Sequence, residues 1–120
     1  MNKFSLPKKI KLLTKKQFIF VFQKPTCIKS IGITLFSRSN NLGYPRIGLT
    51  ISKKYIKLSH ERNRIKRHMR ETFRTNQHKL SSNDFILVIN SKKIIYLKNH
   101  ALIKELQKLW NRHFYSFKNT

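Results

Sequence analysis

The balance of charged residues constrains this chain more than any other feature. Its 120 residues hold 27 lysines and arginines against 4 aspartates and glutamates, a formal net charge of +23 at pH 7. Internal ion pairs can neutralise only a small part of that charge, and the remainder opposes compaction by mutual repulsion. Such a surface is typical of proteins that bind a polyanion. Nucleic acid is the first candidate, through phosphate neutralisation and counterion release, and an anionic membrane is the second.

The sequence lacks the patterns of a membrane span, a secretory signal or a disulfide-stabilised domain. Hydrophobic residues make up 39% of it, and no window reaches the ~18 consecutive apolar residues that a spanning helix needs. Lys8, Lys9 and Lys11 interrupt the first apolar run, unlike the core of a signal peptide. Cys27 is the single cysteine, which suits a reducing compartment. We therefore expect one cytoplasmic domain over residues 1–120.

The acidic residues are too few and too scattered for a catalytic centre. They are Glu61, Glu71, Asp84 and Glu105, whereas a metal-dependent nuclease clusters several acidic ligands around its ions. The five histidines show no ligand spacing. We expect no catalytic residue, no metal site and no cofactor bound by the protein alone.

The first half of the chain predicts a helix followed by strands. Residues 1–12 look like an extended basic segment, and a Thr14–Gln17 capping box starts a helix that ends near residue 23, before Pro25. The apolar run 18–22 is also compatible with a buried strand. Residues 31–38 and 46–52 alternate as two strands around a turn at 40–45, with room for a short extra strand near 27–29. We expect the two alternating strands to be antiparallel neighbours that share one apolar face, with Ile31 on it.

The second half predicts two helices around one buried strand. Residues 59–75 read as a helix, and Leu58, Ile65, Met69 and Phe73 fall on a narrow apolar stripe among basic residues. Residues 81–84 form a turn, 85–89 a strand buried on both faces, and Asn99 can cap a final helix rich in leucine. The expected fold is an α+β sandwich of helices against a small sheet.

The basic helix provides the most specific motif. It reads Glu61-Arg62-Asn63-Arg64-Ile65-Lys66-Arg67-His68-Met69-Arg70-Glu71, then Phe73-Arg74, and it follows the strand end Arg46-Ile47-Gly48-Leu49-Thr50-Ile51-Ser52-Lys53-Lys54. With the Phe18 and Phe22 helix, the Phe36 strand and the last helix, these segments resemble the protein subunits of bacterial ribonuclease P. The resemblance covers nearly the whole chain in the expected order.

The resemblance implies a fold and an activity. The fold is a compact α-β-β-β-α-β-α sandwich with a small mixed sheet and an unusual left-handed β-α-β crossover through the basic helix, whereas most such crossovers are right-handed. The holoenzyme is a hydrolase, an endoribonuclease that removes the 5′ leader of precursor tRNA and leaves a 5′-phosphate. Its RNA carries the catalytic groups and, with substrate, holds most of the Mg²⁺. The protein broadens substrate use, lowers the magnesium demand and is inactive alone.

The resemblance also implies partners and contact residues. The partners are the catalytic RNA and precursor tRNA, with no membrane and no obligate protein partner. Contacts to the catalytic RNA fall on Arg62, Asn63, Arg64, Lys66, Arg67, Arg70 and Arg74. Contacts to the leader fall on Phe18, Phe22, Phe36, Arg46, Lys53 and Lys54. Guanidinium groups suit phosphate oxygens, and an aromatic ring on a polar strand face suits an unpaired base.

Two questions stay open at this level. Phe18 and Phe22 lie four residues apart on one helix face, so they are either core residues or part of a leader-binding surface. Composition alone is equally compatible with a generic ribosomal-type or RNA-chaperone protein. A membrane-active helix is less compatible, because the apolar stripe of residues 59–75 is narrow. A DNA-binding helix-turn-helix is also less compatible, because two strands and not a short partner helix precede this helix.

Overall fold

The computed structural model describes residues 14–80 and 82–118, so the predicted extended segment 1–12 lies outside the described residues. Helix α2 spans Lys15–Gln23 and precedes strands β1 (Thr26–Ser30), β2 (Ile33–Ser39) and β3 (Arg46–Ile51). Helix α3 (Ser59–Asn76) and a short 3-10 helix η1 (Gln77–Lys79) lead to β4 (Asn83–Ile89). A second 3-10 helix η2 (Lys92–Tyr96) precedes helix α4 (Asn99–Lys118). This order confirms the predicted α+β class.

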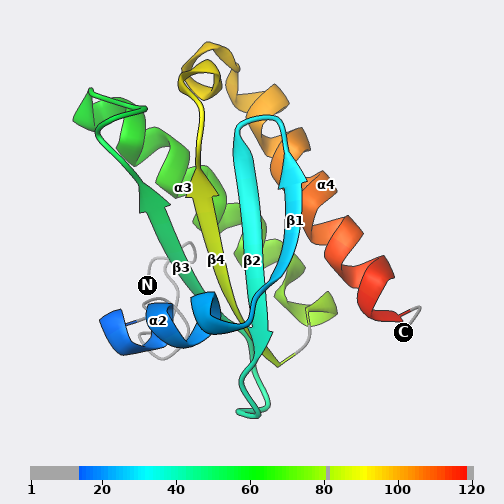
Figure 1. The fold of residues 1–120 in the computed structure, drawn as a ribbon. Helices are drawn as coiled ribbons and strands as arrows, with labels where there is room; N and C mark the ends of the chain where they lie inside the picture. Colours follow the sequence, from blue (N-terminus) through cyan, green and yellow to red (C-terminus); the bar gives the residue numbers. More distant parts are fainter. Residues whose placement is uncertain (1–13, 81, 119–120) are drawn as a thin grey trace, which may run out of the picture.

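The sheet has four strands in the order β1-β2-β4-β3. Strand β4 pairs antiparallel with β2 and parallel with β3. In Figure 1, β3 and β4 both run upward, β4 lies to the right of β3, and the connecting α3 passes behind the sheet. This geometry is a left-handed crossover, as the resemblance implied.

The prediction that residues 31–38 and 46–52 are neighbouring strands is wrong, because β4 lies between them. The apolar run of β4 is buried on both faces and therefore takes a central position in the sheet.

The sheet separates a large core from a small one. Its rear face packs on α3 and α4 around Leu35, Leu87 and Trp110, all almost fully buried. Its front face is crossed by α2 at one end, where Val21 packs on Ile86. Most apolar burial therefore lies behind the sheet, and the front face is left partly uncovered.

A local signal sets the start of α2. Thr14 and Gln17 form the predicted capping box, in which the Thr14 N–H donates to Gln17 Oε1 at 2.6 Å and the Gln17 N–H donates to Thr14 Oγ1 at 3.3 Å. The helical alternative for residues 18–22 is therefore confirmed. The short strand near 27–29 is also confirmed, as part of β1.

Two predicted core positions and one predicted turn are wrong. Ile31 lies in the turn between β1 and β2 and is 66% exposed. Leu58 precedes α3 and is 59% exposed, because the buried stripe begins only at Ile65. Strand β4 begins at Asn83, inside the predicted turn 81–84, since Asp84 pairs with both neighbouring strands and is buried.

A buried polar network joins α3 to α4. The indole N–H of Trp110 donates to Thr72 Oγ1 at 3.1 Å. The side chains of Asn76 and Gln107 exchange two hydrogen bonds, each of 2.8 Å. These bonds fix one register of the two helices behind the sheet, because any slip would leave buried polar groups unpaired. Among the described helices, none is long and apolar enough to cross a membrane.

Candidate nucleic-acid interface

The outer side of α3 presents one basic face. Ile65, Met69 and Phe73 turn inward and are fully buried. At about 100° per residue, Asn63, Lys66, Arg67 and Arg70 fall within one arc of about 100° beside the buried stripe; Asn63 and Arg67 are exposed, and Lys66 and Arg70 are half-buried. The structure gives no side-chain hydrogen bond or ion pair within the described residues to Asn63, Lys66, Arg67 and Arg70. We call these four residues the α3 basic face.

Three other motif arginines make internal contacts. Arg62 Nη1 donates to the carbonyl oxygens of Ile56 and Lys57, each at 2.8 Å. Arg64 pairs with Glu61 at 3.0 Å and donates from Nη1 to Asn99 Oδ1 at 2.7 Å. These contacts brace the N-terminal part of α3.

Arg74 completes this group through its pair with Glu71 at 2.7 Å. Of the residues predicted to contact the catalytic RNA, the structure therefore places Asn63, Lys66, Arg67 and Arg70 together and gives Arg62, Arg64 and Arg74 a bracing role as well.

His68 stands beside the braced end of α3. Its pKa is lowered, mainly by burial and secondly by the positive charge of Arg67; a hydrogen bond with Asn99 only partly offsets this shift. Its imidazole therefore stays neutral to lower pH than usual, so it adds little to the positive charge of α3 near neutral pH.

The front face of the sheet carries the predicted aromatic residues. Phe36 points to this face and is half-buried, and Phe22 meets it edge-on with ring centroids 5.0 Å apart. Phe18 belongs to the small cluster of Val21 and Ile86, whereas Phe22 is 44% exposed. The two phenylalanines therefore differ: Phe18 is partly a core residue, whereas Phe22 lies at the surface.

Helix α2 is fastened to β2 by one arginine. Arg38 Nη1 donates to the carbonyl oxygen of Phe20 at 2.6 Å, and the Arg38 guanidinium lies 3.8 Å from the centroid of the Phe20 ring. This contact keeps the Phe22–Phe36 edge in place. Sequence reasoning missed it, since the residues are 18 positions apart and carry no shared motif.

The predicted basic residues of the leader path lie at two ends of the sheet. Arg46 begins β3 near α2, where its guanidinium forms a bidentate pair with Asp84, at 2.8 Å and 2.7 Å. Lys53 and Lys54 are exposed beyond the other end of β3, roughly 20 Å away at about 3.3 Å per residue. One extended nucleotide strand along the front face could reach both ends.

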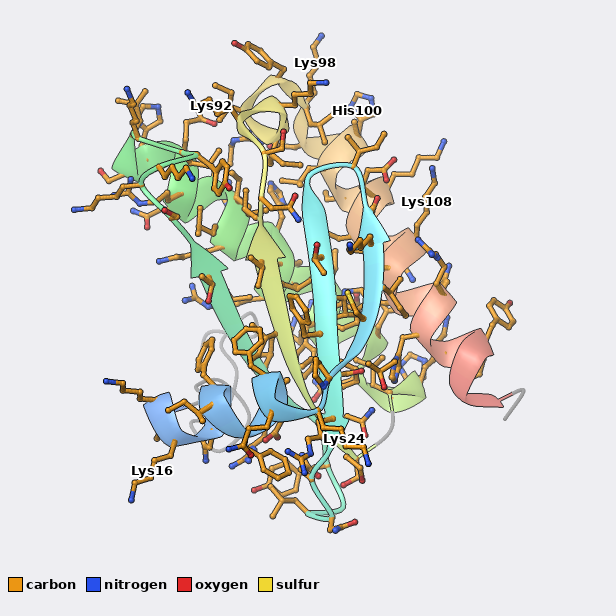
Figure 2. All side chains as sticks on the ribbon, viewed as in Figure 1. Lys16, Lys24, Lys92, Lys98, His100 and Lys108 are labelled. Carbon is orange, nitrogen blue, oxygen red and sulfur yellow. The ribbon has the colours of Figure 1, made fainter. Side chains whose placement is uncertain are left out.

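Further lysines lie away from α3 and the front of the sheet. All four acidic side chains have cationic partners: Asp84, Glu61, Glu71 and, through Lys108, Glu105. Ser30 also donates to Glu105 at 2.7 Å, and this bond is the main cause of the lowered Glu105 pKa. Figure 2 shows lysines projecting from both ends of the molecule, with Lys16 and Lys24 near α2 and Lys92 and Lys98 at the opposite end. In the described part of the chain, no group of three or more His, Cys, Asp or Glu residues could hold a metal ion.

Comparison with known proteins identifies this arrangement. The family model described as ribonuclease P matches residues 6–113. The ribonuclease P protein component of Blochmanniella pennsylvanica is 67% identical over 113 residues, which cover 94% of this chain and 98% of the relative. This chain belongs to the ribonuclease P protein family. The corresponding protein of Photorhabdus laumondii is 51% identical over 94% of both chains.

Solved structures share the fold at low identity. The Staphylococcus aureus ribonuclease P protein superposes with a TM-score of 0.78 at 18% identity, over 85% of this chain and 93% of that one. The Thermotoga maritima protein gives 0.74 at 23%, over 85% and 96%. Membership in the family places the chain in a tRNA-processing ribonucleoprotein with a catalytic RNA as partner.

Proposed function

We propose that the chain, as a single RNA-binding domain, binds the catalytic RNA through the α3 basic face and the 5′ leader of precursor tRNA through the front of the sheet. The proposal rests on the fact that the basic residues of the α3 motif fall into two groups. Some of its arginines brace α3 internally, and the α3 basic face is left for an external polyanion. Each arginine can grip phosphate oxygens with two parallel hydrogen bonds.

Leader recognition rests on Phe22 and Phe36. Their edge-to-face pair joins α2 to β2, and the exposed Thr50 and Lys29 continue the same face of the sheet. An unpaired base can stack on a half-exposed ring whatever its identity. Stacking of this kind would suit leaders of varied sequence.

Catalysis is assigned to the RNA. The carboxylates of the protein are each held by a cation, so none is poised to hold Mg²⁺ or to act as a general base. The protein would act by neutralising phosphates, which lowers the magnesium concentration that the RNA needs, and by binding the leader, which broadens substrate use. We expect it to be inactive alone and to work in the cytoplasm without an obligate protein partner.

The leader assignment is tested by comparing precursor and mature tRNA. Replacing Phe36 with Ala in the reconstituted holoenzyme should weaken the affinity for precursor tRNA by about 1–3 kcal/mol, the range for one stacked base. Affinity for mature tRNA, which has no leader, should not change. Tyr115→Ala, at an exposed ring on α4, serves as the matched control. Equal losses for precursor and mature tRNA would contradict the assignment.

A further inference from the structure

We propose that an aromatic pocket beside the N-terminal end of α3 holds one unpaired nucleobase of the catalytic RNA. The inference rests on the proposed function, because it assumes that the α3 basic face lies on that RNA. The pocket is separate from Phe22 and Phe36, which lie at the α2 end of the front face.

The pocket has the size and lining of a site for one flat ring. Its cavity measures about 340 Å³, within the ~300–1,000 Å³ of small-ligand sites. Its walls are mostly apolar, from the β3–α3 connection on one side and η2 on the other. The principal lining residues are Tyr55, Leu58, Ile95, Tyr96, Lys57 and Lys92.

The lining is unusually exposed for apolar side chains. Tyr96 is 79% exposed, Leu58 59% and Ile95 38%. Scattered exposed apolar residues need no explanation, but a concave group of them marks a binding surface. The pocket also accounts for Leu58, which falls on the predicted stripe of α3 and yet faces solvent.

Both walls are anchored before any ligand binds. Arg62 holds the carbonyl oxygens of Ile56 and Lys57 on one side. On the other side, Ser91 Oγ accepts from the Lys93 N–H at 3.1 Å, and Ile94 is fully buried. A preformed site loses less conformational entropy when a ligand binds.

The rim chemistry favours a nucleotide over a purely apolar ligand. Lys57 and Lys92 stand at the pocket and are exposed, in position for the phosphates on either side of an inserted base. The one carboxylate in the lining, Glu61, already pairs with Arg64. A base stacked on Tyr96 would therefore meet an apolar surface flanked by unneutralised positive charge.

The pocket lies away from the Phe22–Phe36 edge and on the α3 side of the sheet, so we assign it to the catalytic RNA; because Tyr55 follows Lys54 of the proposed leader path, the test measures both RNAs. Its lining includes Glu61, from the first turn of α3, and α3 packs behind the sheet. Helix α2 and the Phe22–Phe36 edge lie in front of the sheet. At about 100° per residue, Glu61 lies on the other side of α3 from the α3 basic face, so a strand bound on that face would pass round the N-terminal end of α3 to enter the pocket, without crossing the sheet.

The test measures the affinity of the full-length protein for the catalytic RNA at several salt concentrations. Tyr96→Ala should weaken binding by about 5-fold or more, the lower end for one lost stack, and Tyr96→Phe should bind like the wild type. The slope of log affinity against log salt should be unchanged by Tyr96→Ala, because a stack releases no counterions. Lys92→Ala should reduce that slope by about 1.

The controls and outcomes separate this pocket from the proposed function. Tyr115→Ala removes another exposed tyrosine, on α4, and Lys108→Ala removes a lysine far from the pocket; neither should reproduce the Tyr96 pattern. If Arg67→Ala weakens binding and Tyr96→Ala does not, the pocket is overturned while the α3 basic face stands. Lost affinity for precursor tRNA, with binding to the catalytic RNA unchanged, would also overturn it. Failure of the wild type to bind the RNA would overturn both.

Discussion

The buried pair of Arg46 and Asp84 allows a direct test of what Arg46 does. Asp84 is 1% exposed and Arg46 16% exposed. Asn40 Nδ2 also donates to Asp84 Oδ1, at 2.8 Å. The hydrogen bond with Asp84 raises the pKa of Arg46, so the guanidinium stays charged. We expect the substitution Arg46→Met to act first on the stability of the fold and only second on the binding of the leader.

Because Asp84 is more deeply buried than Arg46, the two substitutions should lower the free energy of unfolding by different amounts. Arg46→Met leaves the Asp84 carboxylate inside the protein with Asn40 as its remaining side-chain donor. Stranding a buried charge costs about 3 kcal/mol, the lower end of the range for a broken buried pair. Asp84→Asn leaves a guanidinium that can turn toward water, so it should cost only about 1–2 kcal/mol. The double variant should cost less than the sum, because neither charge is then stranded.

Urea unfolding of the isolated protein measures these costs. With a slope of about 1.5 kcal/mol per molar urea, Arg46→Met should lower the midpoint by about 2 M. Leader affinity of the holoenzyme is then measured under conditions where the variant is folded. A variant of wild-type stability with a large loss of leader affinity would refute this reasoning and return Arg46 to a primary role on the leader.

Three further outcomes are expected. Arg67→Ala should weaken binding to the catalytic RNA and reduce the salt slope by about 1, as measured by titration at several salt concentrations. Arg62→Ala should mainly lower the urea midpoint, because Arg62 holds two carbonyl oxygens of the β3–α3 connection; a larger change in salt slope than for Arg67→Ala would contradict this. Burial lowers the pKa of His113 below its usual 6.5. The neutral, buried imidazole therefore stabilises the fold fully above pH 6.5, and this contribution is lost as the pH falls through the lowered pKa of the folded state. His113→Phe should therefore lose less unfolding free energy between about pH 7 and pH 5 than the wild type, and equal losses would show that His113 is not responsible.

Local patterns predicted the elements, because helix caps and apolar periodicity act over a few residues. Thr14 and Gln17 mark the start of α2, and the stripe of Ile65, Met69 and Phe73 identifies the buried side of α3. Strand order was not predicted from periodicity, because alternation says which face a strand buries and not which strand it pairs with. The left-handed crossover came only from the family resemblance.

The sequence also did not show which arginines of the basic motif make internal contacts and which remain free for RNA. Arg62, Arg64 and Arg67 look alike in the chain, and only distant partners separate them. Arg64 meets Asn99, 35 residues away, and Arg62 meets carbonyl oxygens that any residue could supply. The pocket at Tyr96 was missed for a similar reason, since η2 carries no apolar periodicity that would mark it as a surface.

Cleavage of a 5′-extended precursor tRNA at low magnesium tests the central claim most directly. The partner catalytic RNA is assayed with the protein, without it, and with the protein alone. The account predicts no cleavage by the protein alone and restored cleavage when protein and RNA are combined. Magnesium-dependent cleavage after complete removal of the RNA would contradict the assignment of catalysis to the RNA. An RNA whose cleavage is unchanged by a tightly bound protein would support a generic RNA-binding role instead.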